Sequence, residues 1–223
     1  MNIPFDETRR RIFDEVISRL SFQKVYVVGG YIRDFLLSRP SHDVDFSTPL
    51  SPEAVHHAFM DGLYFSRYGT VSFQMEGCDI TIASFRKESR YDDYRHPSRV
   101  EFISDMDVDA LRRDFTINAL YADKDGLLYD PTKNGLKDLR DGLIRLIGNK
   151  KERFLEDPLR ILRAVRFEME LGFSLEEETG EILLSQKELI WRLNPAKMRE
   201  EVRKCPEEKR KDMVSLLNME SLF

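Results

Sequence analysis

Two aspartates separated by one residue, Asp43 and Asp45, have the side-chain type and spacing that best suit catalysis in this sequence. Side chains alternate across a strand, so both carboxylates should point to one face with Val44 behind them. Paired carboxylates repel each other unless a cation lies between them, and hard oxygen ligands favour Mg²⁺. Such a pair suits two-metal phosphoryl transfer, in which one ion activates an attacking hydroxyl and the other holds a triphosphate.

A glycine pair precedes the aspartates. Gly29 and Gly30 follow a strand-like run, where they would let the backbone approach a phosphate, and Arg33 would add positive charge at the start of the next helix. A lone D-x-D segment is usually a solvated strand face, and a lone glycine pair is an equally weak signal. The ordered combination, with Asp43 nine residues beyond Asp34, is far more specific.

A third cluster, LRRDFTINALYA, begins at Leu111. Arg113 could grip a triphosphate, while Asp114 and Asn118 could order a ribose or the local backbone. The alternative is a charged loop that caps a strand.

The segment FLEDPLRILRAVRFEMEL predicts a helix with Pro158 in its first turn. Arg160, Arg163 and Arg166 recur every three residues and share one face, and Asp157 lies one turn before Arg160. An ordinary amphipathic helix with solvated arginines is the alternative.

Asp157 and Arg160 could together read a base without a template, because a carboxylate accepts hydrogen bonds and a guanidinium only donates them. Cytosine and adenine both present an exocyclic amino donor beside a ring-nitrogen acceptor, which matches the pair. Uracil and guanine present the reverse order, and such mismatches can change specificity by several orders of magnitude.

The elements that must position these residues follow from periodicity and turn residues. Asp6 should cap a first helix that buries Ile12, Phe13, Val16, Ile17 and Leu20. Strands are expected over 24–28, 43–46, 71–75, 79–85 and 117–121, helices over 31–37 and 52–60, and a loop over 86–99. Helices are expected over 157–171, 175–184 and 195–204 and up to residue 217, so we place a boundary between residues 147 and 148.

Composition sets limits on the function. The chain has 223 residues, 41% of them hydrophobic, and a net charge of −5, so any contact with nucleic acid must come from local Arg and Lys clusters. Cys78 and Cys205 suggest neither a disulfide framework nor a zinc site. No apolar run approaches the roughly 20 residues of a membrane span, so we expect a cytoplasmic protein without a membrane partner.

Taken together, the sequence resembles the class II tRNA nucleotidyltransferase and bacterial poly(A) polymerase family. The resemblance runs in order through VVGGYIRD, DVDF, RYDDYRHPSRVEF, RRDFTINAL, GLKDLRDGLIRLIG and EDPLRILRAVRF. It implies an α+β fold, with a nucleotidyltransferase head (residues 1–147), whose β-sheet is flanked by helices, followed by an all-helical neck (residues 148–223). Family members usually continue into body and tail domains that clamp tRNA, and we expect these to be absent from this chain.

The resemblance also implies roles for individual residues. Mg²⁺ would be held by Asp43 and Asp45. Gly30, Arg33 and Arg113 would contact the incoming nucleotide, and Asp157, Arg160, Arg163 and Arg166 would complete its pocket. Gly29, Asp114 and Asn118, proposed above from the residues themselves, complete the expected nucleotide-binding set. The stretch Asp92 to Arg95 resembles the family's flexible loop, and residues 135–148 resemble its hinge, which resizes the pocket between C and A.

One departure concerns a third carboxylate. The family often has one five residues before the arginine of a T-F-R-like motif, here Arg86, but that position holds Thr81. Asp79 lies two residues earlier, on the same face of a regular strand, so the sequence leaves open whether Asp79 or no residue takes this place.

The expected activity is template-free addition of C and A from CTP and ATP to the 3′ end of tRNA, whether as CCA, CC or A alone. Poly(A) synthesis is the main alternative. The others are a non-catalytic RNA- or nucleotide-binding module, and a transferase that modifies a small molecule or protein. The Asp43/Asp45 pair argues against a simple binding module, and the Asp157/Arg160 pair argues against strict use of GTP or UTP.

Overall fold

The computed structural model describes residues 3–21, 24–41, 43–91 and 94–222. These form two compact units that interleave along the chain. The first comprises Met1–Glu88, Val100–Arg113 and Ile117–Leu136, and the second comprises Ser89–Arg99, Asp114–Thr116 and Lys137–Phe223. The proposed division into a head and a neck at residue 148 stays a prediction.

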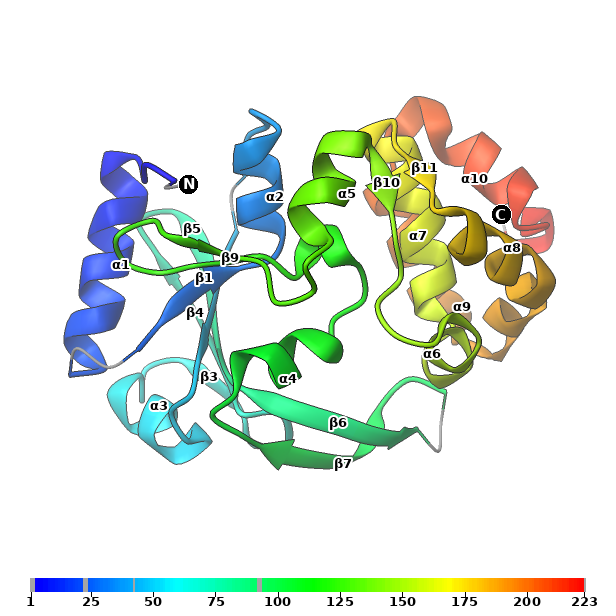
Figure 1. Cartoon of the computed structure of the whole chain (residues 1–223). Coiled ribbons are helices and arrows are strands. Elements are labelled where there is room, and N and C mark those ends of the chain that lie inside the picture. The colour runs from blue at the N-terminus through cyan, green and yellow to red at the C-terminus, as the bar shows by residue number, and fades with distance from the viewer. Residues whose placement is uncertain (1–2, 22–23, 42, 92–93, 223) are drawn as a thin grey trace. The chain divides into compact units, whose positions relative to one another are not determined.

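A seven-stranded mixed sheet with flanking helices forms the first unit, which confirms the predicted fold class (Figure 1). Its strand order is β3-β4-β5-β2-β1-β8-β9, and β2 runs parallel to β5. The strands are β1 (Tyr26–Val28), β2 (Val44–Thr48), β3 (Leu63–Phe65), β4 (Thr70–Met75), β5 (Cys78–Ser84), β8 (Tyr121–Ala122) and β9 (Leu128–Tyr129).

Helix α1 (Glu7–Arg19) forms for the reasons that the sequence suggested. The Asp6 side chain accepts a hydrogen bond from the Arg9 amide at 2.8 Å and so caps the helix. Its apolar face is buried, and Phe13 meets Phe46 of β2 edge-on, with ring centroids 5.2 Å apart. Helices α2 (Gly30–Leu36) and α3 (Pro52–Ala58) also lie where they were predicted.

Two predictions of local structure between residues 86 and 121 were wrong. The expected loop over 86–99 contains β6 (Arg86–Tyr91), which pairs with β7 (Pro97–Phe102) in a separate two-stranded sheet. The expected strand over 117–121 is instead a 3-10 turn at Thr116–Asn118 followed by the short strand β8. Helix α4 (Met106–Leu111), which precedes that turn, was not predicted.

The second unit is mainly helical. Helix α7 (Leu159–Leu171) packs against α6 (Lys150–Glu156), α9 (Pro195–Lys204) and α10 (Arg210–Leu216) (Figure 1). The remaining helices are α5 (Gly135–Asp141), which begins in the first unit, and α8 (Glu177–Gln186). A two-stranded parallel sheet, β10 (Leu143–Ile144) with β11 (Ser174–Leu175), means that the segment after residue 148 is not entirely helical. Within the described residues, no helix is long and apolar enough to span a membrane.

Candidate active site

The two aspartates lie at the start of β2, with Asp43 directly before the strand and Asp45 within it. Both are exposed, whereas Val44 and Phe46 are each 1% exposed. This alternation puts the two aspartates on one face of the sheet, as predicted. Asp45 is the register partner of Val28 on β1 and of Thr81 on β5.

Gly29 makes the turn from β1 into α2, beside Asp45. Its backbone angles, φ 83° and ψ −136°, lie in a region that residues with a Cβ avoid. Its amide donates a hydrogen bond to the Leu120 carbonyl at 3.3 Å, and a Cβ on Gly29 would lie 3.8 Å from Oδ2 of Asp45. The glycine therefore brings bare backbone close to the carboxylate.

Arg33 is buried in the middle of the short helix α2. Its Nε and Nη2 atoms each donate to the Asp34 carboxylate at 2.9 Å, and Nη1 donates to Oδ1 of Asn118 at 2.9 Å. A Cβ on Gly30 would lie 3.7 Å from Nη2 of Arg33. Asn118 thus orders Arg33, and the two residues lie beside the glycine turn.

Arg113 follows α4, and its side chain is mostly buried. Its Nε donates to the Tyr121 hydroxyl at 2.9 Å, and its Nη2 donates to Oδ2 of Asp109 at 3.3 Å. Burial disfavours the charged guanidinium, but Tyr121, Asp109 and Asp45 outweigh that penalty and raise the pKa of Arg113 above its ordinary value. The guanidinium therefore lies within the electrostatic reach of the Asp45 carboxylate.

The aspartate pair has the chemistry expected of a divalent-cation site. Two exposed carboxylates on one face suit Mg²⁺, which typically takes one or two protein carboxylates and completes its shell with water and phosphate. Among the described residues, no group of three or more His, Cys, Asp or Glu is arranged to hold a metal. Thr81 shares a hydroxyl hydrogen bond of 3.3 Å with Ser72, and Asp79 accepts from Gln74 at 3.0 Å.

Asp157 and Arg160 lie together at the start of α7 in the second unit. Oδ1 of Asp157 accepts from the Leu159 amide at 3.1 Å. Burial raises the pKa of Asp157, although Arg160 and that amide oppose the shift. Arg160 is buried and donates through Nη1 to the Arg153 carbonyl at 2.6 Å and to Glu156 at 3.3 Å. Their base-reading role stays a prediction.

The other two arginines of α7 have different partners. Arg163 pairs through Nη2 with Oδ2 of Asp114 at 2.5 Å. Arg166 pairs with Glu201 of α9 and with Glu170 of its own helix, each at 2.5 Å. In this structure Arg166 therefore ties α7 to α9, and the nucleotide-binding roles of these arginines stay predictions.

The hinge-like segment contains an ion pair with a fully buried carboxylate that sequence reasoning missed. Asp138 is fully buried and accepts from Nε of Arg145 at 2.9 Å and from the Thr116 hydroxyl at 2.7 Å. Arg145 also donates to Glu176 at 2.9 Å. In the loop-like segment, Asp92 and Asp93 lie outside the described residues, while the Tyr91 ring lies 5.8 Å from the guanidinium carbon of Arg160.

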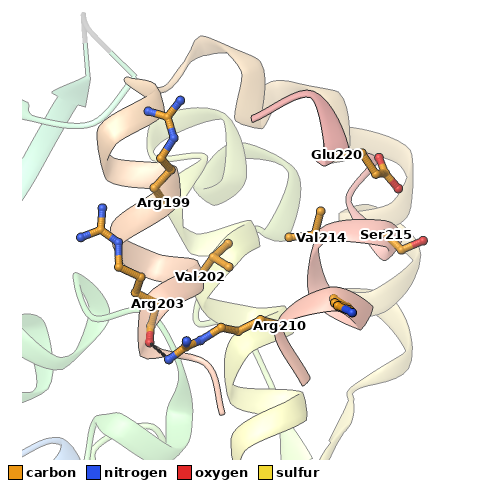
Figure 2. A pocket seen from close by; sticks show the side chains of 8 residues that line it. Arg199, Val202, Arg203, Arg210, Val214, Ser215 and Glu220 are labelled. Carbon is orange, nitrogen blue, oxygen red and sulfur yellow. Dashed lines mark hydrogen bonds between the residues drawn. The ribbon is translucent and has the colours of Figure 1, made fainter. Parts of the chain in front are cut away.

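A cavity of about 580 Å³ in the second unit is lined mainly by residues of α9 and α10 (Figure 2). Val202 and Val214 contribute apolar lining, and Arg199, Arg203 and Arg210 lie around it. Arg210 donates through Nη2 to the Arg203 carbonyl at 2.9 Å. The lining includes none of the predicted site residues.

Comparisons with a family model and with known sequences point to the same family. Residues 25–145 match the family described as the Poly A polymerase head domain. The CCA-adding enzyme of Lactobacillus delbrueckii subsp. bulgaricus is 42% identical over 179 residues, which cover 80% of this chain and 45% of that enzyme. The CCA-adding enzyme of Lactobacillus helveticus is 44% identical over 179 residues, with the same coverage. The chain thus spans less than half the length of these relatives.

Solved structures show the same similarity. The Bacillus stearothermophilus CCA-adding enzyme in complex with CTP superimposes with a TM-score of 0.81 at 30% identity, covering 97% of this chain and 53% of that one. The Thermotoga maritima CCA-adding enzyme complexed with tRNA gives a TM-score of 0.71 at 27% identity, covering 95% of this chain and 50% of that one.

Proposed function

This chain belongs to the Poly A polymerase head domain family, and from that premise we propose that it is a metal-dependent nucleotidyltransferase that adds C and A nucleotides to the 3′ end of tRNA. The observation that carries the proposal is the grouping around β2. Asp43 and Asp45 share one exposed face, the glycine turn passes beside Asp45, and Arg113 lies within its electrostatic reach.

In this reaction the RNA 3′-hydroxyl oxygen bonds to the α-phosphorus of CTP or ATP, and the bond to pyrophosphate breaks. Asp43 and Asp45 would hold Mg²⁺, which supplies activation of the hydroxyl and neutralisation of phosphate charge when bound. Gly29 and Gly30 bring backbone to the triphosphate, and Arg33 and Arg113 balance its charge. Positioning and charge neutralisation dominate the catalysis of phosphoryl transfer.

The choice of C and A rests on the second unit. Asp157 accepts from the exocyclic amino group of cytosine or adenine, and Arg160 donates to the neighbouring ring nitrogen. Arg163 and Arg166 are further nucleotide-binding candidates on the same helix, and Asp114, which pairs with Arg163, orders that arginine. A tRNA end is preferred to a poly(A) tail because the similar sequences described above are CCA-adding enzymes.

A nucleotide screen tests this function. The chain is incubated with Mg²⁺, each of the four labelled nucleoside triphosphates, and tRNAs that end before, within or after CCA. We expect incorporation of C on the shortest tRNA and of A on the tRNA ending in CC, with little U or G. Long A tracts on any RNA would instead indicate poly(A) synthesis. No incorporation at protein concentrations that saturate the RNA would indicate a binding module.

The same proposal includes a cytoplasmic location for the protein. Cys78 and Cys205 are both buried free thiols, which suits a reducing cytoplasm.

A further inference from the structure

Asp109 and Tyr121 form a buried clamp around Arg113. Both are 0% exposed, and the Tyr121 hydroxyl donates to Oδ2 of Asp109 at 2.7 Å. That hydroxyl accepts from Nε of Arg113, while the same Oδ2 accepts from Nη2. Three side chains therefore close a ring of hydrogen bonds that holds two of the three guanidinium nitrogens.

The clamp is anchored on two different elements. Tyr121 lies on β8 as a register partner of Val28, which is in turn a register partner of Asp45. Register partners present their side chains to the same face, so Tyr121 and Asp45 lie on one face of the sheet. Asp109 lies on α4, where its Oδ1 accepts from the Arg86 amide at 3.0 Å and from Nε of Arg112 at 2.8 Å. Strand and helix together thus fix the direction of Arg113.

The Asp109 carboxylate is suited to this task because it is buried, ionised and saturated with donors. A guanidinium on a flexible side chain loses conformational freedom when it binds a phosphate, and a clamp that orders it beforehand removes that cost. The Tyr121 ring adds a cation–π contact, with the Arg113 guanidinium carbon 5.0 Å from its centroid.

We propose that Asp109 and Tyr121 are positioning residues that hold Arg113 towards Asp45, and so towards the triphosphate of the incoming nucleotide. This inference rests on the proposed function, in which Arg113 grips that triphosphate. The two residues act through Arg113, without contacting the nucleotide themselves.

The test is a double-mutant cycle read by CTP binding in the presence of Mg²⁺, which needs no RNA. Tyr121→Phe keeps the ring but removes the acceptor of Nε, and we expect CTP affinity to fall roughly tenfold. In an Arg113→Ala background the same change should have no further effect, because a positioning residue has nothing left to position. Asp109→Asn should behave like Tyr121→Phe, and it provides a second arm if one variant folds poorly.

Tyr129→Phe is the matched control. Tyr129 is the register partner of Tyr121 on the next strand, and its hydroxyl likewise donates to an aspartate, Asp123, at 3.0 Å. Its loss should leave CTP affinity unchanged. Wild-type affinity in Tyr121→Phe and Asp109→Asn, or losses that add fully to that of Arg113→Ala, would overturn the inference alone. Absence of CTP binding by the wild-type chain would overturn the proposed function and the inference together.

Discussion

The Oδ2 atom of Asp45 lies 3.8 Å from the point where a Cβ on Gly29 would stand. A methyl group there would therefore meet the carboxylate at van der Waals distance, beside the place that the proposed function gives to a triphosphate. The backbone conformation adds a second penalty, because φ 83° with ψ −136° is strained for any residue with a side chain.

We expect Gly29→Ala to lower the free energy of unfolding by about 1–3 kcal/mol and to raise the KM for CTP and ATP. Gly77→Ala separates the two effects. Gly77 also has a positive φ, 74°, but nothing lies within 4 Å of its Cβ position. That variant should lose stability and keep nucleotide transfer, and an equal KM in both variants would argue against a nucleotide beside Gly29.

Removal of either of the two proposed metal-binding carboxylates should abolish transfer without unfolding the chain. Asp43 and Asp45 are exposed, so their loss leaves no cavity. Metal ions supply several kcal/mol of transition-state stabilisation, and we expect Asp45→Ala to reduce kcat/KM on the order of 10³-fold or more. Circular dichroism and the melting temperature should stay close to those of the wild type, and a fully active variant would refute the metal assignment.

Asp79→Asn addresses the question of a third carboxylate. The carboxylate of Asp79 accepts a hydrogen bond from Gln74. The residue that lies opposite Asp45 on β5 is Thr81, not Asp79. We therefore expect transfer by Asp79→Asn to stay within about twofold of the wild type, as for other exposed substitutions away from a functional site. A loss as large as that of Asp45→Ala would make Asp79 a third metal ligand.

The aspartate pair was predictable because a strand with one buried face leaves a period-two pattern in the sequence. The paired strands β6 and β7 were not predictable, because residues 86–91 and 97–102 are mostly polar and mostly exposed or half-exposed, and no apolar period runs through them. The strand predicted over 117–121 was wrong for the opposite reason. Ile117, Ala119 and Leu120 are fully buried, and an apolar run buried on all sides does not distinguish a strand from a tight turn.

Motif residues could be predicted more readily than the residues that hold them. Arg33 stands out as a cation after a glycine pair and before Asp34, and Arg113 as a cation before Asp114. Asp109 lies four residues before Arg113, a spacing that brings two side chains together only in a helix. Because α4 was not predicted, the contact between them could not be predicted either. The contact of Tyr121 with Arg113 depends on a strand register that no local pattern specifies.

Asp109 should make folding stability depend on pH in the acidic range. Its burial opposes ionisation, but Arg112, Arg113 and its hydrogen bonds prevail and lower its pKa from 3.8 to about 2. Because the folded-state pKa lies below the ordinary value, the ionised form contributes stability above pH 3.8, and that contribution is lost as the pH falls towards 2. The contribution at neutral pH is about 2 kcal/mol.

Urea unfolding at several pH values measures this contribution. Asp109→Asn should be less stable than the wild type at neutral pH, and the gap should narrow as the pH falls below 3.8. Asp14→Asn is the control, because Asp14 is exposed and pairs only with Arg10 among the described residues, so its loss should change stability little. If the difference in unfolding free energy between the wild type and Asp109→Asn stays constant with pH, the ionised Asp109 carboxylate is not the source of that stability.

Base choice should also depend on pH, through Asp157. Burial raises the pKa of this carboxylate, so it takes up a proton at a higher pH than an ordinary aspartate does. An ionised Asp157 can only accept hydrogen bonds. A protonated Asp157 can also donate its O–H to the O4 atom of uracil, while its other oxygen still accepts from the amino group of cytosine. The ratio of kcat/KM for CTP to that for UTP should therefore be constant near neutral pH and fall as the solution is acidified.

Incorporation of a single nucleotide on one RNA, measured with CTP and UTP over a range of pH, tests this dependence. The ratio cancels effects that are common to both nucleotides, such as metal binding and ionisation of the 3′-hydroxyl. Asp157→Ala should show a low ratio that no longer varies with pH. Glu156→Gln, which alters a neighbouring carboxylate bonded to Arg160, should keep the wild-type slope. If the slope survives in Asp157→Ala, the titrating group that governs base choice lies elsewhere, and Asp157 does not read the base.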